Sequence, residues 1–449
     1  MKREACFSID LLGKTPQKSN YFASFVLPSD KLRRRALLSC KAQGYMTQRS
    51  DITPQEQTAR HTLKRLSRPR NTTQKASSSR ASRCRSFCYN LFHSVSWLIN
   101  LFLVALPYLL ALLGQYLSPR FFLFPAYLGL AFPFLLSMVV LFLLFRLVRR
   151  QWRGFIFNFL LLALSWWSIR SYIPLHPTPS VIPPHAVKVL SLNCQAFAYE
   201  KHTADKPNPT LRYIKDSHAD IVCLQEAAIM RDDSPYVSAK KITEYLPEYP
   251  YVVTRYAQGD RGTSLMLLSK FPVRNTRMLP LESTFNGGIA YTLDVAGREL
   301  TVFNLHLESF RLTTEDGTRY ARLAREIEAV ALKEQMEQKL GPAFLKRAKQ
   351  ADRVHVEIIH EKTPYILVCG DFNDTPISYA HQRIASGLID AYASTGCGTG
   401  YSFTFKRLGF RIDHILHSRR VKSYNCKVDK SATISDHKPL SCFISLEYF

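Results

Sequence analysis

The sequence predicts a membrane-anchored α/β protein in which two packed β-sheets flanked by helices follow a group of transmembrane helices. Three observations support this fold class. Long apolar segments lie before residue 174, a proline-rich stretch follows them, and short apolar runs then alternate with polar helical patterns from Val187 onward. That alternation is typical of sheets covered by helices, in an α+β or layered α/β sandwich.

The first 92 residues are rich in Lys, Arg, Ser, Gln and Thr and have no apolar period, which predicts a basic and mostly disordered arm. Residues 1–185 hold 25 of the 60 Lys and Arg and only 5 of the 35 Asp and Glu, whereas residues 186–449 hold 35 and 30. The net charge of +25 therefore belongs mainly to the N-terminal part, and it gives little support for nucleic-acid binding by the rest. The sequence leaves open whether translation starts at Met1 or at Met46.

Residues 93–173 are predicted to form a membrane anchor of three helices, over about 95–117, 121–145 and 154–173. The first two apolar runs are long enough to cross a hydrocarbon core of about 30 Å. The third has only 16 uncharged residues, from 154 to 169, but Trp166 and Trp167 after its middle suit a membrane interface. A third span thus has weaker support than the first two.

Basic residues set the predicted orientation. The arm and the loop that carries Arg146, Arg149, Arg150 and Arg153 are expected to be cytoplasmic, so three spans place the C-terminal domain on the outer face. Two spans would leave it in the cytoplasm. Cys194, Cys223 and Cys369 lie within apolar runs, which predicts buried free thiols and argues mildly against an oxidising compartment.

A stiff linker over 174–186 is predicted from its five prolines, and residues 187–449 then form one domain. The expected strands in that domain lie at 187–192, 221–224, 264–268, 300–307, 366–368, 412–416 and 440–444. Helices are expected at 210–218 and 318–360, the second interrupted at Gly341-Pro342.

The stretch from Ile366 to Pro376 carries the strongest indication of chemistry. A buried apolar strand ends there, and Gly370 lets the backbone turn sharply where Asp371 and Asn373 emerge. Residues two apart point the same way, so a carboxylate and an amide can address one water or one phosphate oxygen. This arrangement is typical of hydrolysis.

Other predicted strands also end in polar residues. Singly, each is more often a cap or turn residue than a site residue. In chain order they are Asn193, Glu226, His306, Asp371 with Asn373, Asp413, and the Asp436-His437 pair.

Together these residues resemble the endonuclease/exonuclease/phosphatase superfamily over roughly residues 187–449. Gly-Asp-x-Asn followed by a terminal Ser-Asp-His carries the resemblance, which is closest to membrane-anchored bacterial members. It implies a four-layer sandwich and a metal-dependent hydrolase of phosphate esters, in the bacterial inner membrane with its catalytic domain on the periplasmic face. His306 is similar to the histidine of deoxyribonuclease-like and sphingomyelinase-like members and argues against an apurinic endonuclease.

The resemblance also implies roles for single residues. Glu226 would bind Mg²⁺, with Mn²⁺ as the alternative, since carboxylate oxygens suit such hard cations. Asn193 would position the metal or a phosphate oxygen, and Asp436 would lie at or near the metal. Asp371, helped by Asn373, would orient and deprotonate the attacking water.

The remaining candidate residues are those expected to stabilise the negative charge of the phosphate or to pack beside the site. Asp413 would bind His437 and favour its cationic form, and His306 would act as an acid or a phosphate donor. Arg411, two residues before Asp413, is expected either to pair with phosphate or to form a surface salt bridge. His414 points away from Asp413 on a strand and is interpreted as a packing residue.

The expected function is a membrane-anchored, Mg²⁺-dependent phosphodiesterase, with a nuclease-type substrate as the first expectation because nucleic acid is the commonest family substrate. A lipid head-group phosphodiesterase of sphingomyelinase type and an inositol-phosphate phosphatase are the alternatives, and a catalytically dead binding protein is the last. The expected partners are the phosphodiester substrate and the lipid bilayer, with no protein partner.

Overall fold

The computed structural model describes residues 86–88, 90–258, 261–283, 286–310, 334, 336–405 and 408–446. Within it, residues Arg85–Phe449 form one compact unit. The arm predicted over 1–92 lies almost wholly outside the described residues, as does most of the helical pattern before residue 336.

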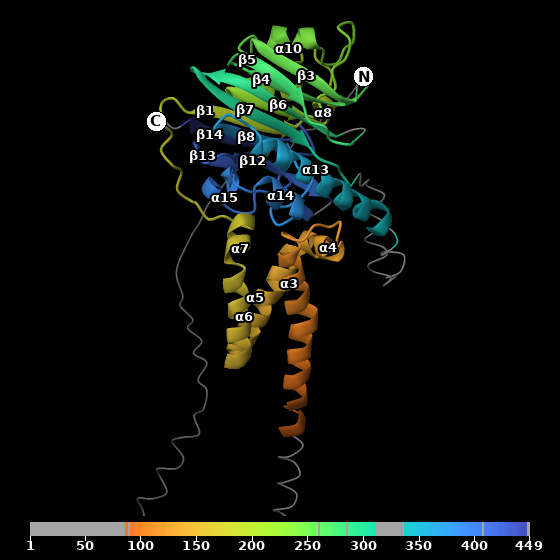
Figure 1. The fold of residues 1–449 in the computed structure, drawn as a ribbon, viewed down its shortest axis with the longest axis vertical. Helices are drawn as coiled ribbons and strands as arrows, with labels where there is room; N and C mark the ends of the chain where they lie inside the picture. The colour runs from red at the N-terminus through yellow and green to blue at the C-terminus, as the bar shows by residue number, and fades with distance from the viewer. Residues whose placement is uncertain are drawn as a thin grey trace, which may run out of the picture. The chain divides into compact units, whose positions relative to one another are not determined.

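Two six-stranded sheets form the body of the C-terminal domain (Figure 1). The first has the order β13-β14-β1-β2-β4-β3, and the second has the order β5-β6-β7-β8-β12-β9. The strands of the first sheet are β1 (Val187–Asn193), β2 (Ile221–Gln225), β3 (Tyr251–Gln258), β4 (Arg261–Ser269), β13 (Val421–Val428) and β14 (Leu440–Leu446). Those of the second are β5 (Val273–Met278), β6 (Gly287–Val295), β7 (Arg298–His306), β8 (Tyr365–Asp371), β9 (Ile389–Asp390) and β12 (Asp413–His417). A small hairpin of β10 (Phe403–Phe405) and β11 (Leu408–Phe410) stands apart from both.

Alternate residues of each central strand face two different cores. In β1, Val187 and Val189 face the core between the sheets, whereas Leu190 and Leu192 face the outer helices. The first sheet is covered by α8 (Gln195–Ala198), α9 (Pro209–Ser217) and α10 (Ala239–Tyr245), and the second by α13 (Gly341–Ile359) and α14 (Tyr379–Ile384). A last short helix, α15 (Ala391–Thr395), packs at the edge of the inner core. The predicted four-layer sandwich is confirmed.

Each sheet has one parallel pair at its centre, and these pairs position the site. Strand β1 runs parallel to β2 with Asn193 opposite Gln225, and β7 runs parallel to β8 with His306 opposite Asp371. Strand β12 is antiparallel to β8, so its first residue, Asp413, also lies opposite Asp371. The carboxyl ends of both parallel pairs therefore carry polar side chains to one edge of the sandwich.

Each of the seven strands expected from sequence overlaps an observed strand; only 300–307 and 412–416 extend beyond one, each by a single residue. The predicted helix at 210–218 corresponds to α9. Gly341-Pro342 does not interrupt a helix but begins α13, where the missing N–H of proline costs no hydrogen bond. A short π-helix, η2 (Met336–Leu340), precedes it.

The apolar N-terminal region of the unit is helical but more broken than predicted. A helical run over Ser86–Leu113, which includes the π-helix η1 (Asn100–Ala105) and α3 (Leu106–Leu113), is long and apolar enough to cross a membrane. Two further pairs qualify only if each bent pair counts as one span: α4 (Phe124–Leu130) with α5 (Phe132–Val148), bent by 73°, and α6 (Trp152–Leu164) with α7 (Trp166–Tyr172), bent by 60°.

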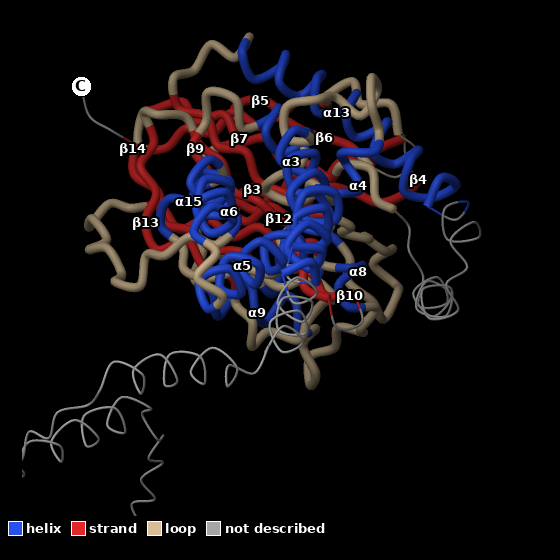
Figure 2. Tube along the Cα trace, turned by 90° about the horizontal axis from the view of Figure 1, so that it is seen from below, coloured by secondary structure: helices blue, strands red, loops and turns tan. Residues whose placement is uncertain are grey.

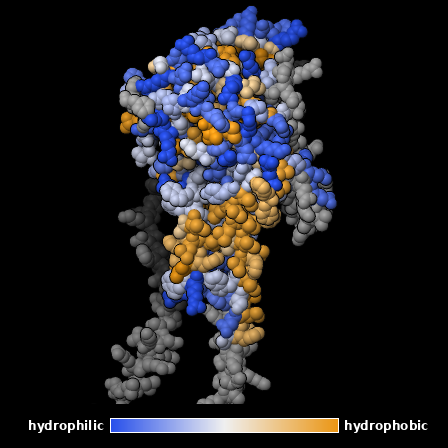
Figure 3. Space-filling view, in the orientation of Figure 1, coloured by the Kyte–Doolittle hydropathy of each residue, from blue (hydrophilic) through white to orange (hydrophobic). Residues whose placement is uncertain are grey.

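In the structure, each of the helices predicted over 121–145 and 154–173 is broken into a bent pair. The first breaks at Ala131, because Pro133 at the start of α5 has no N–H to continue the ladder from α4. The second breaks at Ser165, whose side-chain oxygen bonds back to the carbonyl of Leu161 at 2.8 Å. In Figure 2, which is seen from below, α3 and α6 lie in front of the sheets, and Figure 3 shows an apolar band below the largely hydrophilic surface of the sandwich.

Candidate active site

Asn193 links the two sheets at the edge where their parallel strands end. Its Nδ2 donates to Glu226 Oε1 and to Asp371 Oδ2, each at 3.1 Å. Asn193 and Glu226 come from the first sheet and Asp371 from the second, so one buried amide holds two carboxylates from different sheets together.

The backbone at the end of β8 is bent to present Asp371. Gly370 has φ +144°, and a Cβ there would lie 1.9 Å from the carbonyl oxygen of Leu305 on β7. Asn373 has φ +52°, and its N–H donates to Asp371 Oδ1 at 2.8 Å while its Nδ2 donates to the carbonyl of Leu307 at 2.9 Å. The glycine and the asparagine thus hold this carboxylate in place, as the sequence predicted for Gly370.

His437 and Asp413 form a short buried pair. His437 Nδ1 lies 2.8 Å from Asp413 Oδ2, and its other nitrogen, Nε2, lies 3.7 Å from Asp371 Oδ2. Burial alone would lower the pKa of His437, but the charges of Asp413 and Asp371 and the hydrogen bond that His437 donates to Asp413 outweigh it and raise that pKa to about 10. The imidazole is therefore a cation at neutral pH, and it points that charge at Asp371.

Asp371 is itself tuned by its surroundings. Burial raises its pKa to about 6, although the neighbouring imidazoles of His437 and His306 oppose the rise. His306 Nε2 lies 3.6 Å from Glu226 Oε1 and 3.7 Å from Asp371 Oδ2, and it is buried without a hydrogen-bond partner among the described residues. Asp371 can therefore take up a proton close to physiological pH.

The donors at the outer side of this cluster suit a hard divalent cation. Glu226 is partly exposed and Asp436 is exposed beside it at the cavity surface, while Ser435 Oγ donates to the carbonyl of Asn193 at 2.7 Å and keeps the Asp436 loop against β1. The carboxylates of Glu226, Asp371 and Asp436 converge here with the amide of Asn193 and with His306 Nε2, which has no hydrogen-bond partner among the described residues. The negative charge of these carboxylates exceeds the positive charge of the neighbouring side chains. Oxygen donors of this kind match Mg²⁺ and Mn²⁺.

A cavity of about 280 Å³ opens over these groups. One side carries the polar residues of the site, and the other is apolar. The lining residues are Leu130, Glu226, Ser309, Phe310, Asp371, Asn373, Asp374, Phe403, Phe405, Phe410, Ile412, Asp436 and His437.

Arg411 does not face this cavity, which corrects the expectation that it binds phosphate or a surface carboxylate. It is 1% exposed, its guanidinium stacks on the ring of Tyr392 at 4.6 Å, and it donates to the carbonyl oxygen of Ser171 at the end of α7. Arginine at a helix C-terminus stabilises the unpaired carbonyls there. His414 lies on the far side of β12, where it contacts Phe372 and the carbonyl of Asp374, in agreement with a packing role.

Sequence reasoning missed a buried ion pair behind the site. Arg347 is fully buried; its Nε donates to Asp374 Oδ2 at 3.1 Å and its Nη1 to the carbonyl of Glu308 at 2.6 Å. The sequence around it gives no sign of burial, because its basic and acidic residues are balanced at helical spacing, as is typical of a solvated helix face. The missed apolar wall of the cavity left no signal either, because its phenylalanines come from segments far apart in the sequence.

Comparison with known proteins gives one extensive match. A model of the endonuclease/exonuclease/phosphatase family matches residues 190–437, more than half of the chain and every predicted site residue. A second model, described as a domain of unknown function, matches residues 91–172. No curated protein matches the chain in sequence.

Three similar solved structures come from Beutenbergia, Neisseria and human. An endonuclease/exonuclease/phosphatase from Beutenbergia cavernae is 16% identical and covers 58% of this chain and 72% of its own, with a TM-score of 0.41. A 3′ phosphatase from Neisseria bound to product DNA hairpin is 19% identical, with 59% and 100% covered and a TM-score of 0.39. The human Nocturnin catalytic domain with bound sulfate is 18% identical, with 60% and 97% covered and a TM-score of 0.42.

Proposed function

Since the chain belongs to the endonuclease/exonuclease/phosphatase family and is a phosphoester hydrolase, we propose that it hydrolyses phosphodiesters with Mg²⁺ at a membrane surface. The observation that carries this proposal is the geometry around Asp371. A carboxylate with a raised pKa lies between an amide that binds it and a cationic imidazole held by a second carboxylate.

In the proposed reaction, a water attacks phosphorus in line and the bond from phosphorus to the leaving oxygen breaks. Asp371 accepts the proton of the water, held in position by Asn193 Nδ2 and by the N–H of Asn373. His437, fixed by Asp413, faces the phosphate with its cationic Nε2–H and stabilises the charge that develops there. His306 supplies the proton that the leaving oxygen takes up, and the products are a phosphate monoester and an alcohol.

Glu226, Asn193 and Asp436 would hold the divalent cation, which supplies Lewis-acid stabilisation of the phosphate oxygens when bound. Mg²⁺ is the first candidate and Mn²⁺ the second, because the donors are carboxylate and amide oxygens. Nucleic acid, inositol phosphates and lipid head groups all present the phosphate on which these residues would act, so the catalytic proposal does not depend on the substrate class.

We also propose that the helices over residues 86–172 cross the bacterial inner membrane three times. Arg149 and Arg150 are exposed in the turn between α5 and α6, and Arg153 is exposed in the first turn of α6; the positive-inside rule expects such a basic connection in the cytoplasm. The catalytic domain follows α7, which ends on the opposite side of a third span. The proposed location of the catalytic domain is therefore the periplasmic face.

The catalytic proposal is tested with the full chain in detergent micelles, Mg²⁺ and the reporter bis(p-nitrophenyl) phosphate. Asp371→Asn is expected to lower kcat/KM by about 10³-fold or more, because it removes the base. Asp232→Asn, in an exposed loop, is the matched control and is expected to behave as the wild type. Chelator should abolish turnover and added Mg²⁺ should restore it. Near-wild-type turnover by a folded Asp371→Asn variant would refute the mechanism.

A further inference from the structure

The apolar wall of the cavity comes from three places in the fold. Phe403, Phe405 and Phe410 come from the β10–β11 hairpin, Phe310 follows β7, and Leu130 is the last residue of α4. All five are partly buried, as expected of side chains that face a cavity. The ring of Phe403 lies 4.9 Å from that of His437, so the wall begins directly beside the catalytic groups.

Leu130 belongs to the apolar N-terminal helices and not to the sandwich. Helix α4 is bent by 73° from α5, and the two helices qualify as a membrane span only as a pair. Because of this bend, α4 does not continue the axis of α5, and its last residue, Leu130, lines the cavity over Asp371. At the other end of α4, Phe121 and Phe122 are exposed together with Phe124.

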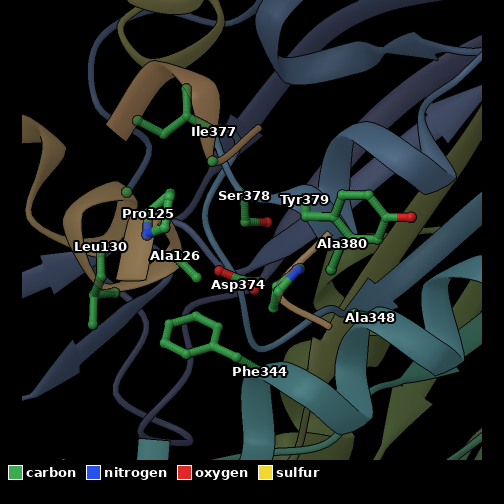
Figure 4. Close-up of a pocket in the computed structure, with 13 residues that line it drawn as sticks. Pro125, Ala126, Leu130, Phe344, Ala348, Asp374, Ile377, Ser378, Tyr379 and Ala380 are labelled. Carbon is green, nitrogen blue, oxygen red and sulfur yellow. The ribbon is translucent and has the colours of Figure 1, made fainter. Parts of the chain in front are cut away.

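Close packing holds α4 in this place. Only about 10 Å³ of space remains between α4 and the segment from Asp374 to Ala380, and Figure 4 shows Pro125, Ala126 and Leu130 of α4 around that space. Ile377 is fully buried in the same core as the apolar helices. A Cβ added at Gly129 would lie 3.6 Å from the carbonyl oxygen of Ile377, so the backbone of α4 approaches this segment to within about one methyl group.

A chain of aromatic contacts continues from α4 to the cavity. Tyr127 meets Phe344 edge-on at 5.5 Å, and Phe344 meets Phe310 at 5.0 Å. The guanidinium of Arg347 lies under both phenylalanines, 4.2 Å from the ring of Phe310 and 5.0 Å from that of Phe344. The same arginine binds Asp374, next to Asn373 of the site. The apolar helices and the catalytic residues therefore share one packed structure.

A half-apolar cavity of this kind fits a substrate that is itself half apolar. Removal of apolar surface from water is favourable in proportion to its area, so an alkyl chain would be bound by the phenylalanines and Leu130. The catalytic domain is also close to electrical balance, with 35 Lys and Arg against 30 Asp and Glu after residue 185. Nucleic-acid binding depends mainly on phosphate neutralisation by cations, for which this balance offers little.

Building on the proposed phosphodiester hydrolysis, we propose that the substrate is a membrane lipid phosphodiester. Its phosphate lies at Asp371 and His437, and the first part of its apolar chain lies along Leu130, Phe310 and the β10–β11 hairpin. Helix α4 is then both a part of the anchor and one wall of the active site.

The test uses the full chain reconstituted in phosphatidylcholine vesicles with Mg²⁺. Three substrates are compared: dioleoyl phosphatidyl-p-nitrophenol in the vesicles, its chain-free analogue glycerophospho-p-nitrophenol in solution, and a single-stranded DNA oligonucleotide. The wild type is expected to prefer the chain-bearing diester to its chain-free analogue by about 100-fold or more in kcat/KM, since several apolar contacts are lost with the chains.

Leu130→Ser and Phe405→Ser are each expected to reduce this preference by about tenfold. The matched controls are Phe124→Ser, an exposed residue of the same helix, and Leu408→Ser, an exposed residue of the same hairpin; neither lines the cavity, and both should keep the wild-type preference.

Equal turnover of the chain-free diester, faster turnover of DNA, or an unchanged preference in both serine variants would overturn the lipid substrate and leave the hydrolase proposal intact. Absence of Mg²⁺-dependent turnover on all three substrates by folded wild-type protein would overturn the hydrolase proposal, and the lipid substrate with it.

Discussion

At the scale of single residues, the Asp413–His437 pair decides the charge facing the phosphate. The pKa of His437 in the folded protein, about 10, lies above its ordinary value of 6.5. The stabilisation from this pair is therefore fully present below pH 6.5 and is lost as pH rises toward 10. Asp371, with a pKa of about 6, must lose its proton to act as a base, so activity should rise with pH through that region.

Asp413→Asn is expected to shift the alkaline limit of activity. The wild type should keep its kcat/KM up to about pH 10, whereas the variant should lose activity from a lower pH, because burial without the Asp413 charge lowers the pKa of His437. The measurement is the pH profile of kcat/KM on bis(p-nitrophenyl) phosphate, with Asp232→Asn as the control. An alkaline limit that stays in place would show that Asp413 does not set the charge of His437.

At the scale of elements, the parallel pairs β1/β2 and β7/β8 position the site. Gly370 makes this arrangement possible, since β7 and β8 approach so closely that the carbonyl of Leu305 occupies the place of a Cβ. Its φ of +144° is also a conformation that residues with a side chain rarely adopt. One glycine therefore sets both the direction of Asp371 and the distance between the two strands.

Gly370→Ala is expected to destabilise the domain by about 3 kcal/mol and to lower its activity, because the β7–β8 pair must separate to admit the methyl group. Gly387→Ala is the matched control: φ is +83° there, but nothing lies within 4 Å of the added Cβ, so only the backbone cost of about 1 kcal/mol remains. Thermal unfolding of both variants in the same detergent measures the difference. Equal shifts in Tm would mean that the close approach of β7 and β8 is not maintained.

At the scale of the whole molecule, the apolar helices and the sandwich belong to one compact unit. Arg411 binds the end of α7, and two residues later on the chain Asp413 binds His437. The proline-rich segment is also attached, since the carbonyl of Pro174 accepts from Gly398 and the N–H of Ser180 donates to Asn425. The segment predicted to be a linker thus lies along the domain that it precedes.

The proposed three-span topology gives a prediction at this scale. Alkaline phosphatase fused after Phe449 should be active in a bacterial host, and green fluorescent protein at the same position should stay dark, because the C-terminus would be periplasmic. The opposite pattern would mean that α6 and α7 do not cross the membrane. The cysteines described in the structure are all free, with Cys194, Cys223 and Cys369 buried as predicted.

The sequence alone determined the sandwich and the polar residues of the site, because hydrophobic period and strand-end motifs are local properties. The sequence could not place Arg411, because the position of this side chain depends on the packing of α7 against the segment before β12, where Arg411 binds the carbonyl of Ser171. It also gave no sign of Arg347 behind the site or of Leu130 and the phenylalanines in the cavity. These residues meet only through packing between segments up to about 280 positions apart, and side-chain burial at such contacts is decided by the tertiary structure.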